Sequence, residues 1–356
     1  MIYLNSNNNG GIMVRSKRKP FIDIRISEEE KLISDIKDLF ITKGVIPYLI
    51  AHPGVGKTSI IKKINPNYLI YNVTLFNEED LIKEQPVWYT ELVNLSNRCD
   101  SCLIVFDDFD KINYNLQKYF FGLTKREKNI DDLVIPSNAN VLLCGLSEEY
   151  TDCDYMLDFK LNSYLKRIEM KVKINEWIHW ANNNHVNNII KSYLNENPKD
   201  LIKDVKDNNK YSHSLSLTPK SWSTRINDEL YISSMLGIKP NLDYYMDSKT
   251  KDKFLEYMNK FNELNIQDII DGKITVVDKF KYNSSDISFI TNALIVSVYR
   301  IEEIQRAISF LNKVGYREYK DLFLSLWSNI NDNNEDLLNM KNAILNVHRE
   351  EKRNEK

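Results

Sequence analysis

The chain has 356 residues, a formal net charge of −2 and a hydrophobic content of 42%. This length allows two domains with a sizeable core, while the near-neutral charge gives no overall bias toward nucleic acid. No run of about 18 apolar residues predicts a membrane span, and the first residues lack the basic and apolar regions of a secretion signal. We therefore expect a cytoplasmic protein whose four cysteines are reduced thiols.

Residues 1–20 are polar and rich in Asn and Gly, which predicts a flexible polar arm. The arm carries a basic cluster from Arg15 to Lys19. Such a cluster is typical of a solvated tail, and contact with nucleic acid or a protein partner is the alternative. A helix is expected next, from Ser27 to Thr42, because a capping residue and acidic first-turn residues precede a regular apolar face.

The most informative stretch begins with an apolar run, 46–50, that predicts a buried strand. A turn-rich loop and a helix over 58–64 follow, which is the layout of a phosphate-binding loop. The consensus G-x-x-x-x-G-K-[ST] has a glycine where this chain has Ala51. Backbone N–H groups of such a loop close around phosphate oxygens, and its lysine reaches the β- and γ-phosphates. The residues predicted to bind the nucleotide are His52, Pro53, Gly54, Val55, Gly56, Lys57, Thr58 and Ser59.

A second motif is an apolar run over 102–106 that leads into Asp107 and Asp108. A buried parallel strand that ends in carboxylates places them at the edge of the sheet where α/β proteins bind ligands. We expect Asp107 to hold Mg²⁺ together with Thr58, and Asp108 to orient or deprotonate the attacking water. The alternative is a strand that merely ends in an acidic turn.

The remaining pattern predicts an α/β domain followed by helices. Strands are expected at 68–75, 140–145 and 168–174, and helices at 86–96, 113–124 and 157–167. Five strands separated by helices predict a doubly wound parallel sheet of the P-loop NTPase type over 21–174. The helices expected after it are 175–184, 186–195, 198–206, 219–236, 250–263, 284–313, 316–329 and 333–350.

From about residue 21 to residue 277 the order of these motifs resembles that of AAA+ ATPases, most of all the MoxR-like ATPases of bacteria and phages. Besides the phosphate-binding loop (Walker A), the segments that carry the resemblance are 107–112 (Walker B), 125–145 (the approach to sensor 1), 164–168, 176–181 and 218–222 (sensor 2). The resemblance implies an AAA+ core over 21–174, an all-α lid over 175–240 and a C-terminal helical region over 241–356.

The resemblance also assigns further residues. Arg167 matches the arginine finger that acts on the γ-phosphate of a neighbouring subunit, and an ordinary surface arginine is the alternative. Lys220 stands where sensor 2 usually has arginine, which keeps the charge but loses the bidentate fork. Asp108 stands where most members have glutamate, and Leu146 or Ser147 occupies the place of the sensor 1 asparagine.

These features predict an enzyme that hydrolyses ATP to ADP and phosphate with Mg²⁺ and that remodels or helps to assemble a protein partner. The resemblance implies a homo-oligomeric ring, usually a hexamer, a partner with a von Willebrand A-type domain, and the cytoplasm of a bacterium or a phage-infected host. Two alternatives stay open. One is a nucleotide-gated scaffold with little hydrolysis, suggested by the departures from the family's motifs. The other is a phage DNA-replication or packaging motor, supported only by the basic arm.

Overall fold

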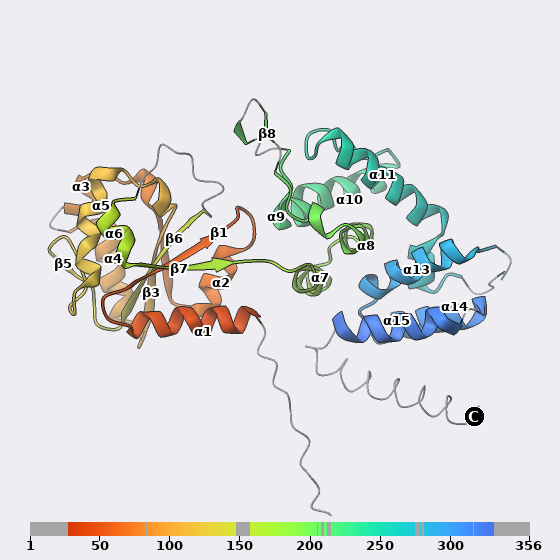
Figure 1. Cartoon of the computed structure of the whole chain (residues 1–356), viewed down its shortest axis with the longest axis horizontal. Coiled ribbons are helices and arrows are strands. Elements are labelled where there is room, and N and C mark those ends of the chain that lie inside the picture. Colours follow the sequence, from red (N-terminus) through yellow and green to blue (C-terminus); the bar gives the residue numbers. More distant parts are fainter. Residues whose placement is uncertain are drawn as a thin grey trace, which may run out of the picture.

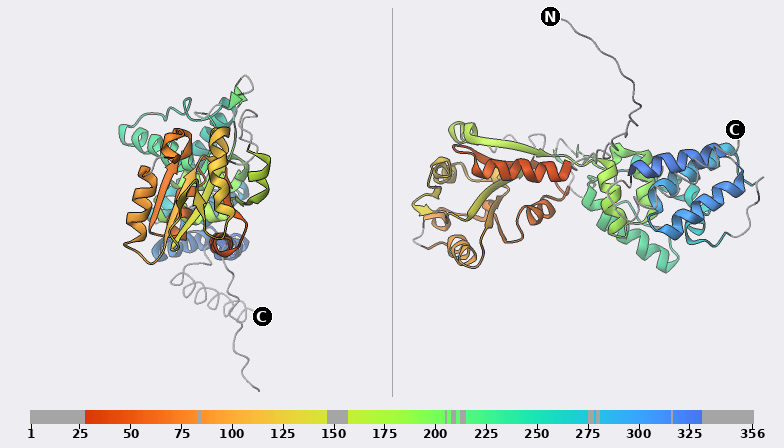
Figure 2. Two further views of the ribbon diagram at one scale, coloured as in Figure 1. Left: turned by 90° about the vertical axis from the view of Figure 1, so that its left-hand side faces the viewer. Right: turned by 90° about the horizontal axis from the view of Figure 1, so that it is seen from below.

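The computed structural model describes residues 28–82, 85–146, 157–204, 206–207, 210–211, 215–274, 278, 281–315 and 317–330. The predicted arm over 1–20, Ser147 and the predicted helix over 333–350 lie outside these residues. Figure 1 shows two lobes, one built around a sheet and the other mainly from helices. The right view in Figure 2 shows the lobes joined end to end, and in the left view the sheet lobe lies in front of the helical lobe.

The first lobe contains a parallel five-stranded sheet, which confirms the predicted α/β class. The strands lie in the order β2-β3-β6-β1-β7, and every neighbouring pair is parallel. Parallel strands are joined by crossover connections, usually through a helix, so strands that follow one another in the chain need not be neighbours in the sheet. The bounds of the strands are Ile46–Ala51 for β1, Tyr68–Asn72 for β2, Cys102–Asp107 for β3, Ala139–Leu146 for β6 and Leu165–Met170 for β7.

Each face of the sheet is covered by its own apolar cluster, as the alternation of side chains along a strand requires. In β3, Ile104 and Phe106 belong to one cluster, while Leu103 and Val105 belong to the other. Helices α1 and α2 cover the second face, and α4, α6 and the 3₁₀ segment η3 cover the first. The bounds are Glu28–Ile41 for α1, Lys57–Ile64 for α2, Val87–Ser96 for α4, Phe159–Tyr164 for α6 and Lys118–Thr124 for η3.

Several predicted bounds in this lobe were wrong. The strand expected over 68–75 ends at Asn72, whose side chain accepts a hydrogen bond from the Thr74 N–H and starts the 3₁₀ turn η1 (Val73–Leu75). The helix expected over 113–124 is α-helical only from Tyr114 to Gln117 (α5), and then tightens into η3. The turn or helix expected to begin at 78–81 is α3 (Glu79–Ile82). The short elements not predicted are η2 (Phe109–Lys111), β4 (Asn129–Ile130) and β5 (Leu133–Val134).

The strand expected over 168–174 is β7, and it begins at Leu165 and ends at Met170. Its six residues pair with β1 from Ile46 to Ala51, so β7 has no strand partner once β1 has ended. Arg167 therefore lies within a strand, and not at the end of the helix that was expected over 157–167.

The second lobe packs its helices around one apolar cluster that includes residues on both sides of position 240, from Trp177 to Trp327. The helix expected over 198–206 is only a 3₁₀ turn, η5 (Pro198–Asp200), followed by the strands β8 (Lys206–Asp207) and β9 (Lys210–Tyr211). No described helix is long and apolar enough to cross a bilayer. The other bounds are Ile174–Asn183 for α7, Asn188–Glu196 for α8, Pro219–Ser221 for α9, Trp222–Ile226 for the π-helical η6, Asn227–Leu236 for α10, Ser248–Glu263 for α11, Ile266–Asp271 for α12, Ser284–Ser297 for α13, Ile301–Val314 for α14 and Arg317–Ile330 for α15.

The single helix expected over 284–313 is two helices, α13 and α14. The Glu303 carboxylate accepts hydrogen bonds from the backbone N–H groups of Tyr299 and Arg300, which satisfies donors that a continuous helix would have paired internally. The break therefore has a local cause, a side chain that caps the second helix.

Candidate nucleotide-binding site

The loop between β1 and α2 has the backbone geometry of a phosphate-binding loop. Gly54 and Gly56 have φ values of 76° and 104°, in the left-handed region that residues other than glycine rarely adopt. The Gly56 carbonyl accepts hydrogen bonds from the N–H groups of Ser59 and Ile60, which begins α2 directly after the loop. The N-terminus of an eight-residue helix thus follows a loop of small residues, and this arrangement favours an anion at the loop.

An ion pair joins this loop to the end of β3. The Lys57 Nζ lies 2.8 Å from Asp107 Oδ1, and the two side chains are 14% and 29% exposed. Burial opposes the charged form of the lysine, but the nearby Asp107 carboxylate outweighs it and raises the pKa of Lys57. The ammonium group is therefore held in its charged form beside the loop.

Asp108 is held by its neighbours on two sides. Its backbone has a φ of 56°, a left-handed conformation that aspartate tolerates better than most residues. Its N–H donates to Asp107 Oδ1 over 3.0 Å, and its Oδ2 accepts a hydrogen bond from Asn72 Nδ2 over 2.9 Å. Sequence analysis did not single out Asn72. The available signal was that Asn72 ends the strand next to β3 and lies in register with Asp107.

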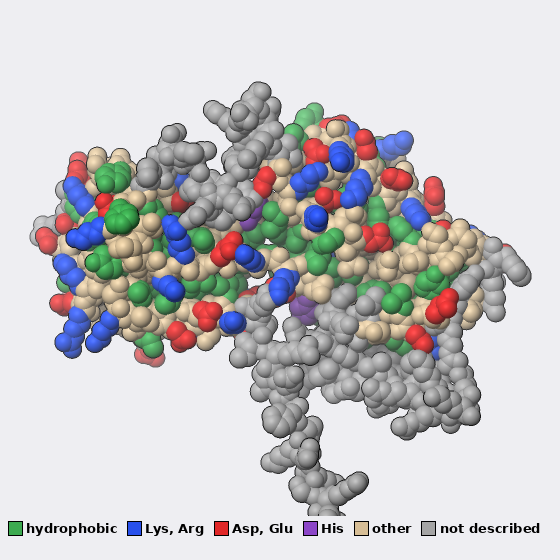
Figure 3. All heavy atoms as spheres, in the orientation of Figure 1, with side chains coloured by type: hydrophobic (Ala, Val, Ile, Leu, Met, Phe, Trp, Pro, Cys, Tyr) green, Lys and Arg blue, Asp and Glu red, His purple; other side chains and the backbone are tan. Residues whose placement is uncertain are grey.

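A cleft of about 970 Å³ opens beside the loop. Residues 54–60 form one wall, and the other walls come from α1, the end of β7, α7 and the start of α9. Lys220 lines the cleft from the second lobe, and so does Trp180, whose side chain is 44% exposed. Acidic and basic side chains gather along the junction of the two lobes in Figure 3. The cleft brings the predicted residues Gly54–Ser59 and Lys220 together.

The second lobe contacts the loop backbone directly. The Lys220 N–H donates to the Gly54 carbonyl over 3.1 Å. The space at Gly54 is so tight that a Cβ there would lie 2.7 Å from Thr218 Oγ1. His52 makes a second link, because its Nε2 lies 3.2 Å from Asp204 Oδ1 while its Nδ1 donates to the Pro53 carbonyl. His52 thus points toward the second lobe, a contact that sequence spacing gave no means of finding.

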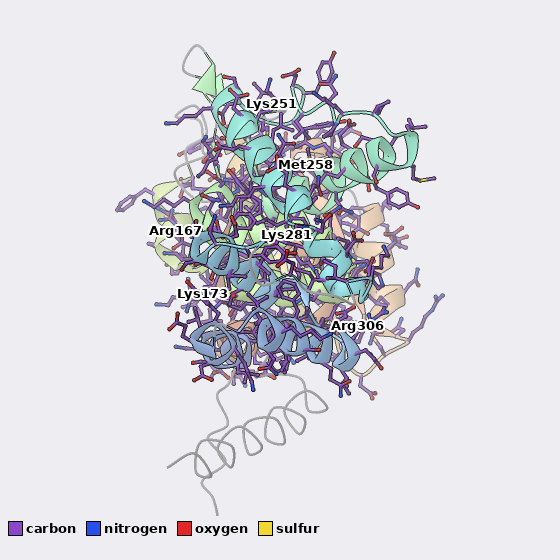
Figure 4. The ribbon with its side chains drawn as sticks, turned by 90° about the vertical axis from the view of Figure 1, so that its right-hand side faces the viewer. Arg167, Lys173, Lys251, Met258, Lys281 and Arg306 are labelled. Carbon is purple, nitrogen blue, oxygen red and sulfur yellow. The ribbon has the colours of Figure 1, made fainter. Side chains whose placement is uncertain are left out.

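Arg167 is not brought to this cleft within the same chain. It lies opposite Tyr48 in the middle of the sheet edge, and its Nη2 donates to Asn162 Oδ1 over 3.0 Å. Met170, at the end of β7, is three positions further along the strand, which is about 10 Å at the rise of an extended strand. Figure 4 shows Arg167 at the edge of the molecule.

Of the two residues expected at the place of the sensor 1 side chain, only Leu146 lies within the described residues. Leu146 is the last residue of β6, and its backbone N–H donates to Asp110 Oδ1 over 3.0 Å. Asp110 is 4% exposed, and its other carboxylate oxygen has no hydrogen-bond partner among the described residues. Burial raises the pKa of Asp110, although the bond from Leu146 works in the opposite direction.

The side-chain oxygens near the loop suit a Mg²⁺ ion that is bound together with a nucleotide. They do not suit a metal ion whose ligands all come from the protein. No cluster of three or more His, Cys, Asp or Glu side chains that could hold a metal occurs among the described residues. Mg²⁺ bound with a nucleotide usually needs only one or two protein oxygens, because phosphates and water supply the rest. The exposed Thr58 hydroxyl at the start of α2 and the Asp107 carboxylate are groups of the required kind.

No family model matches the chain, and no curated protein matches it. Among solved structures, a point mutant of RuvB from Thermotoga maritima is 13% identical with a TM-score of 0.34, over 71% of this chain and 80% of that one. Hsp104, in a closed state with ATPγS and FITC-casein, is 13% identical with a TM-score of 0.30, over 45% of this chain and 40% of that one. At these scores the class, an α/β fold with a P-loop, follows from the sheet and the loop themselves.

Proposed function

We propose that the chain is an AAA+ ATPase that binds Mg²⁺-ATP in the cleft between its lobes and hydrolyses it. The observation that carries the proposal is the Lys57–Asp107 ion pair, which joins a glycine-rich loop to the carboxyl end of β3. A lysine and an aspartate held together in this way are the two groups that a phosphate and its magnesium ion would separate.

Each residue would then have a distinct task. Lys57 would leave Asp107 and contact the β- and γ-phosphates, while the N–H groups of the loop close around the phosphate oxygens. Thr58 and Asp107 would hold the Mg²⁺, whose chemistry is to neutralise charge that develops on the phosphate oxygens. Lys220, exposed at the cleft, would add a positive charge from the second lobe.

Asp108 would orient the attacking water or remove its proton. Its carboxylate accepts a hydrogen bond from Asn72, which fixes its direction. We infer that the present arrangement is a resting one, from which Asp108 is released when the site is completed.

Arg167 would act between subunits, because in its own chain it lies about 10 Å back from the phosphate-binding edge of the sheet. This role requires self-assembly, and a homo-oligomeric ring of the MoxR-like type, usually a hexamer, is the form we propose. A protein client, of which a von Willebrand A-type domain is one candidate, would be remodelled by movement of the second lobe. The setting would be the cytoplasm, where Mg²⁺-ATP is abundant.

The test is ATP turnover per subunit, measured across a range of protein concentrations. We expect turnover to rise with concentration, since the finger acts in trans, and to vanish in Lys57→Ala. Lys62→Ala is a matched control, because Lys62 lies on the same helix and lines the same cleft without an ion pair to Asp107. Turnover that equals that of Lys57→Ala at every concentration would contradict hydrolysis by the chain alone.

A nucleotide-gated scaffold is the second candidate, and the contact of Asn72 with Asp108 favours it specifically. If that contact persists with ATP bound, the catalytic carboxylate stays engaged and the nucleotide only fixes the lobes. Tight ATP binding without turnover, with Asn72 still bonded to Asp108 in the complex, would support this candidate over the first.

A further inference from the structure

A second cleft, of about 680 Å³, lies wholly within the helical lobe. It is formed by the end of α7, the start of α8, the end of α13 and the start of α14, all in the right-hand half of Figure 1. It shares no lining residue with the cleft at the phosphate-binding loop. Its wall is rich in side-chain amides: Asn182, Asn183, Asn187, Asn188 and Gln267.

This cleft contains a buried lysine. Lys191 lies on α8 and is only 5% exposed, and its Nζ donates to Asn182 Oδ1 over 2.7 Å. No carboxylate among the described residues forms an ion pair with it. Burial lowers the pKa of Lys191 to about 8, although the more distant Glu303 carboxylate works against the change. A buried ammonium without a direct counter-ion is costly, and such groups cluster at functional sites.

The neighbouring amide supplies a second donor that is unused. Asn182 is 9% exposed, and its Nδ2 has no hydrogen-bond partner among the described residues. Its orientation is fixed by Lys191, because exchange of the amide O and N would set two donor groups against each other. The cleft therefore presents an ammonium and an amide N–H₂ side by side, both with donors to spare.

Several other polar groups near the cleft are already occupied, although the Arg300 side chain also lines it. At the start of α8 the Asn187 side chain accepts from the Ile189 N–H, and at the start of α14 Glu303 accepts from the N–H groups that precede it. The carboxylates of Glu302 and Glu303 line the cleft beside Arg300 and offset its charge. Two side-chain donors match the two oxygens of a carboxylate, and the acidic pair disfavours a phosphate, which carries its double charge on a single group.

We propose that this cleft binds a small-molecule carboxylate, with the carboxylate oxygens on Lys191 and Asn182 and the rest of the ligand against the surrounding amides. The volume of the cleft lies within the range of small-molecule sites, which is about 300–1,000 Å³. The site is separate from the nucleotide cleft. Failure of the ATPase proposal would therefore not affect this proposal, and its own failure would leave the ATPase proposal unchanged.

The test uses the full chain without nucleotide, with succinate as the carboxylate probe, and with succinamide and inorganic phosphate at matched ionic strength. We expect succinate to raise the melting temperature in a saturable way and succinamide to have no effect. Lys191→Met should remove the shift, because the methionine keeps the volume but not the charge. The exposed Lys199 provides the control Lys199→Met, which should keep the shift in full.

A spectroscopic measurement protects the test against a variant that folds poorly. In protein grown with ¹³C-labelled lysine, the Cε resonance missing from Lys191→Met identifies Lys191. Succinate should raise the pH midpoint of this resonance toward that of an exposed lysine, because a carboxylate favours the ammonium form. An unmoved midpoint, an equal effect of succinamide, or an effect of phosphate as large as that of succinate would each overturn the proposal.

Discussion

Replacement of Gly54 by alanine tests whether the helical lobe bears directly on the phosphate-binding loop. Two costs are expected. Alanine in the left-handed region costs roughly 1–2 kcal/mol, and Gly54 has a φ of 76°. The new Cβ would also lie 2.7 Å from Thr218 Oγ1 and 3.2 Å from Lys220 Cβ, distances at which one of the lobes must move. Overpacking of this kind costs about 1–3 kcal/mol.

The chain provides a matched control in Gly44. Its φ of 72° is nearly the same, but nothing lies within 4 Å of a Cβ at that position. Gly44→Ala should therefore lower the free energy of unfolding by roughly 1–2 kcal/mol, the backbone term alone. Gly54→Ala should lower it further by about 1–3 kcal/mol, the packing term. The difference between the two variants isolates the contact between the lobes.

Chemical denaturation of both variants gives the stabilities, and titration with a fluorescent ATP analogue gives the affinities. We expect Gly44→Ala to bind the analogue as wild type does. Gly54→Ala should bind it about tenfold more weakly or worse, since about 1.4 kcal/mol corresponds to a factor of ten. Equal losses of stability and equal affinities in the two variants would refute the reasoning, because the lobe would then place no constraint on the loop.

Two further changes test the environment of the carboxylates. Asn72→Ala should raise basal ATP turnover by roughly 10- to 150-fold, since the lost hydrogen bond to the charged Asp108 is worth about 1.5–3 kcal/mol. Thr74→Ala, which leaves the bond to Asp108, is the control, and a fall in turnover in Asn72→Ala would mean that Asn72 positions the base. Burial raises the pKa of Asp110 above its ordinary 3.8, so its ionisation costs stability as the pH rises through that range. The Asp110→Asn variant should therefore have a higher melting temperature than wild type at neutral pH, and the same melting temperature below pH 3.8. Asp252 is exposed, and the control variant Asp252→Asn should have the melting temperature of wild type at both pH values.

The parts of the fold that the sequence predicted correctly have strong local signals. β3 consists of five fully buried apolar residues before Asp107, and both faces of that strand are covered. The phosphate-binding loop combines two glycines with a lysine at fixed spacing. Such patterns require no knowledge of distant residues, and the structure has the strand and the loop where they were expected.

The features that sequence analysis missed depend on contacts between distant segments. β7 ends at Met170 because its partner β1 ends at Ala51, and the alternation of residues from 165 onward does not reveal that limit. The pairing of Asn72 with Asp108 depends on which strands are neighbours in the sheet. The contact of His52 with Asp204 joins residues 152 positions apart. No local periodicity of the sequence predicts any of these three features.

The loop is fixed from two directions, and this arrangement determines what a nucleotide must change. From the sheet, Asp107 holds Lys57. From the helical lobe, the Lys220 N–H holds the Gly54 carbonyl and Asp204 holds His52. On the proposed function, phosphate separates only the first of these contacts, so the loop can exchange its ionic partner while its backbone stays bonded to the second lobe. A ligand shifts a conformational equilibrium only by the difference in its contacts between two states. Movement of the helical lobe must therefore be driven by groups that reach the cleft from that lobe, such as the charged side chain of Lys220.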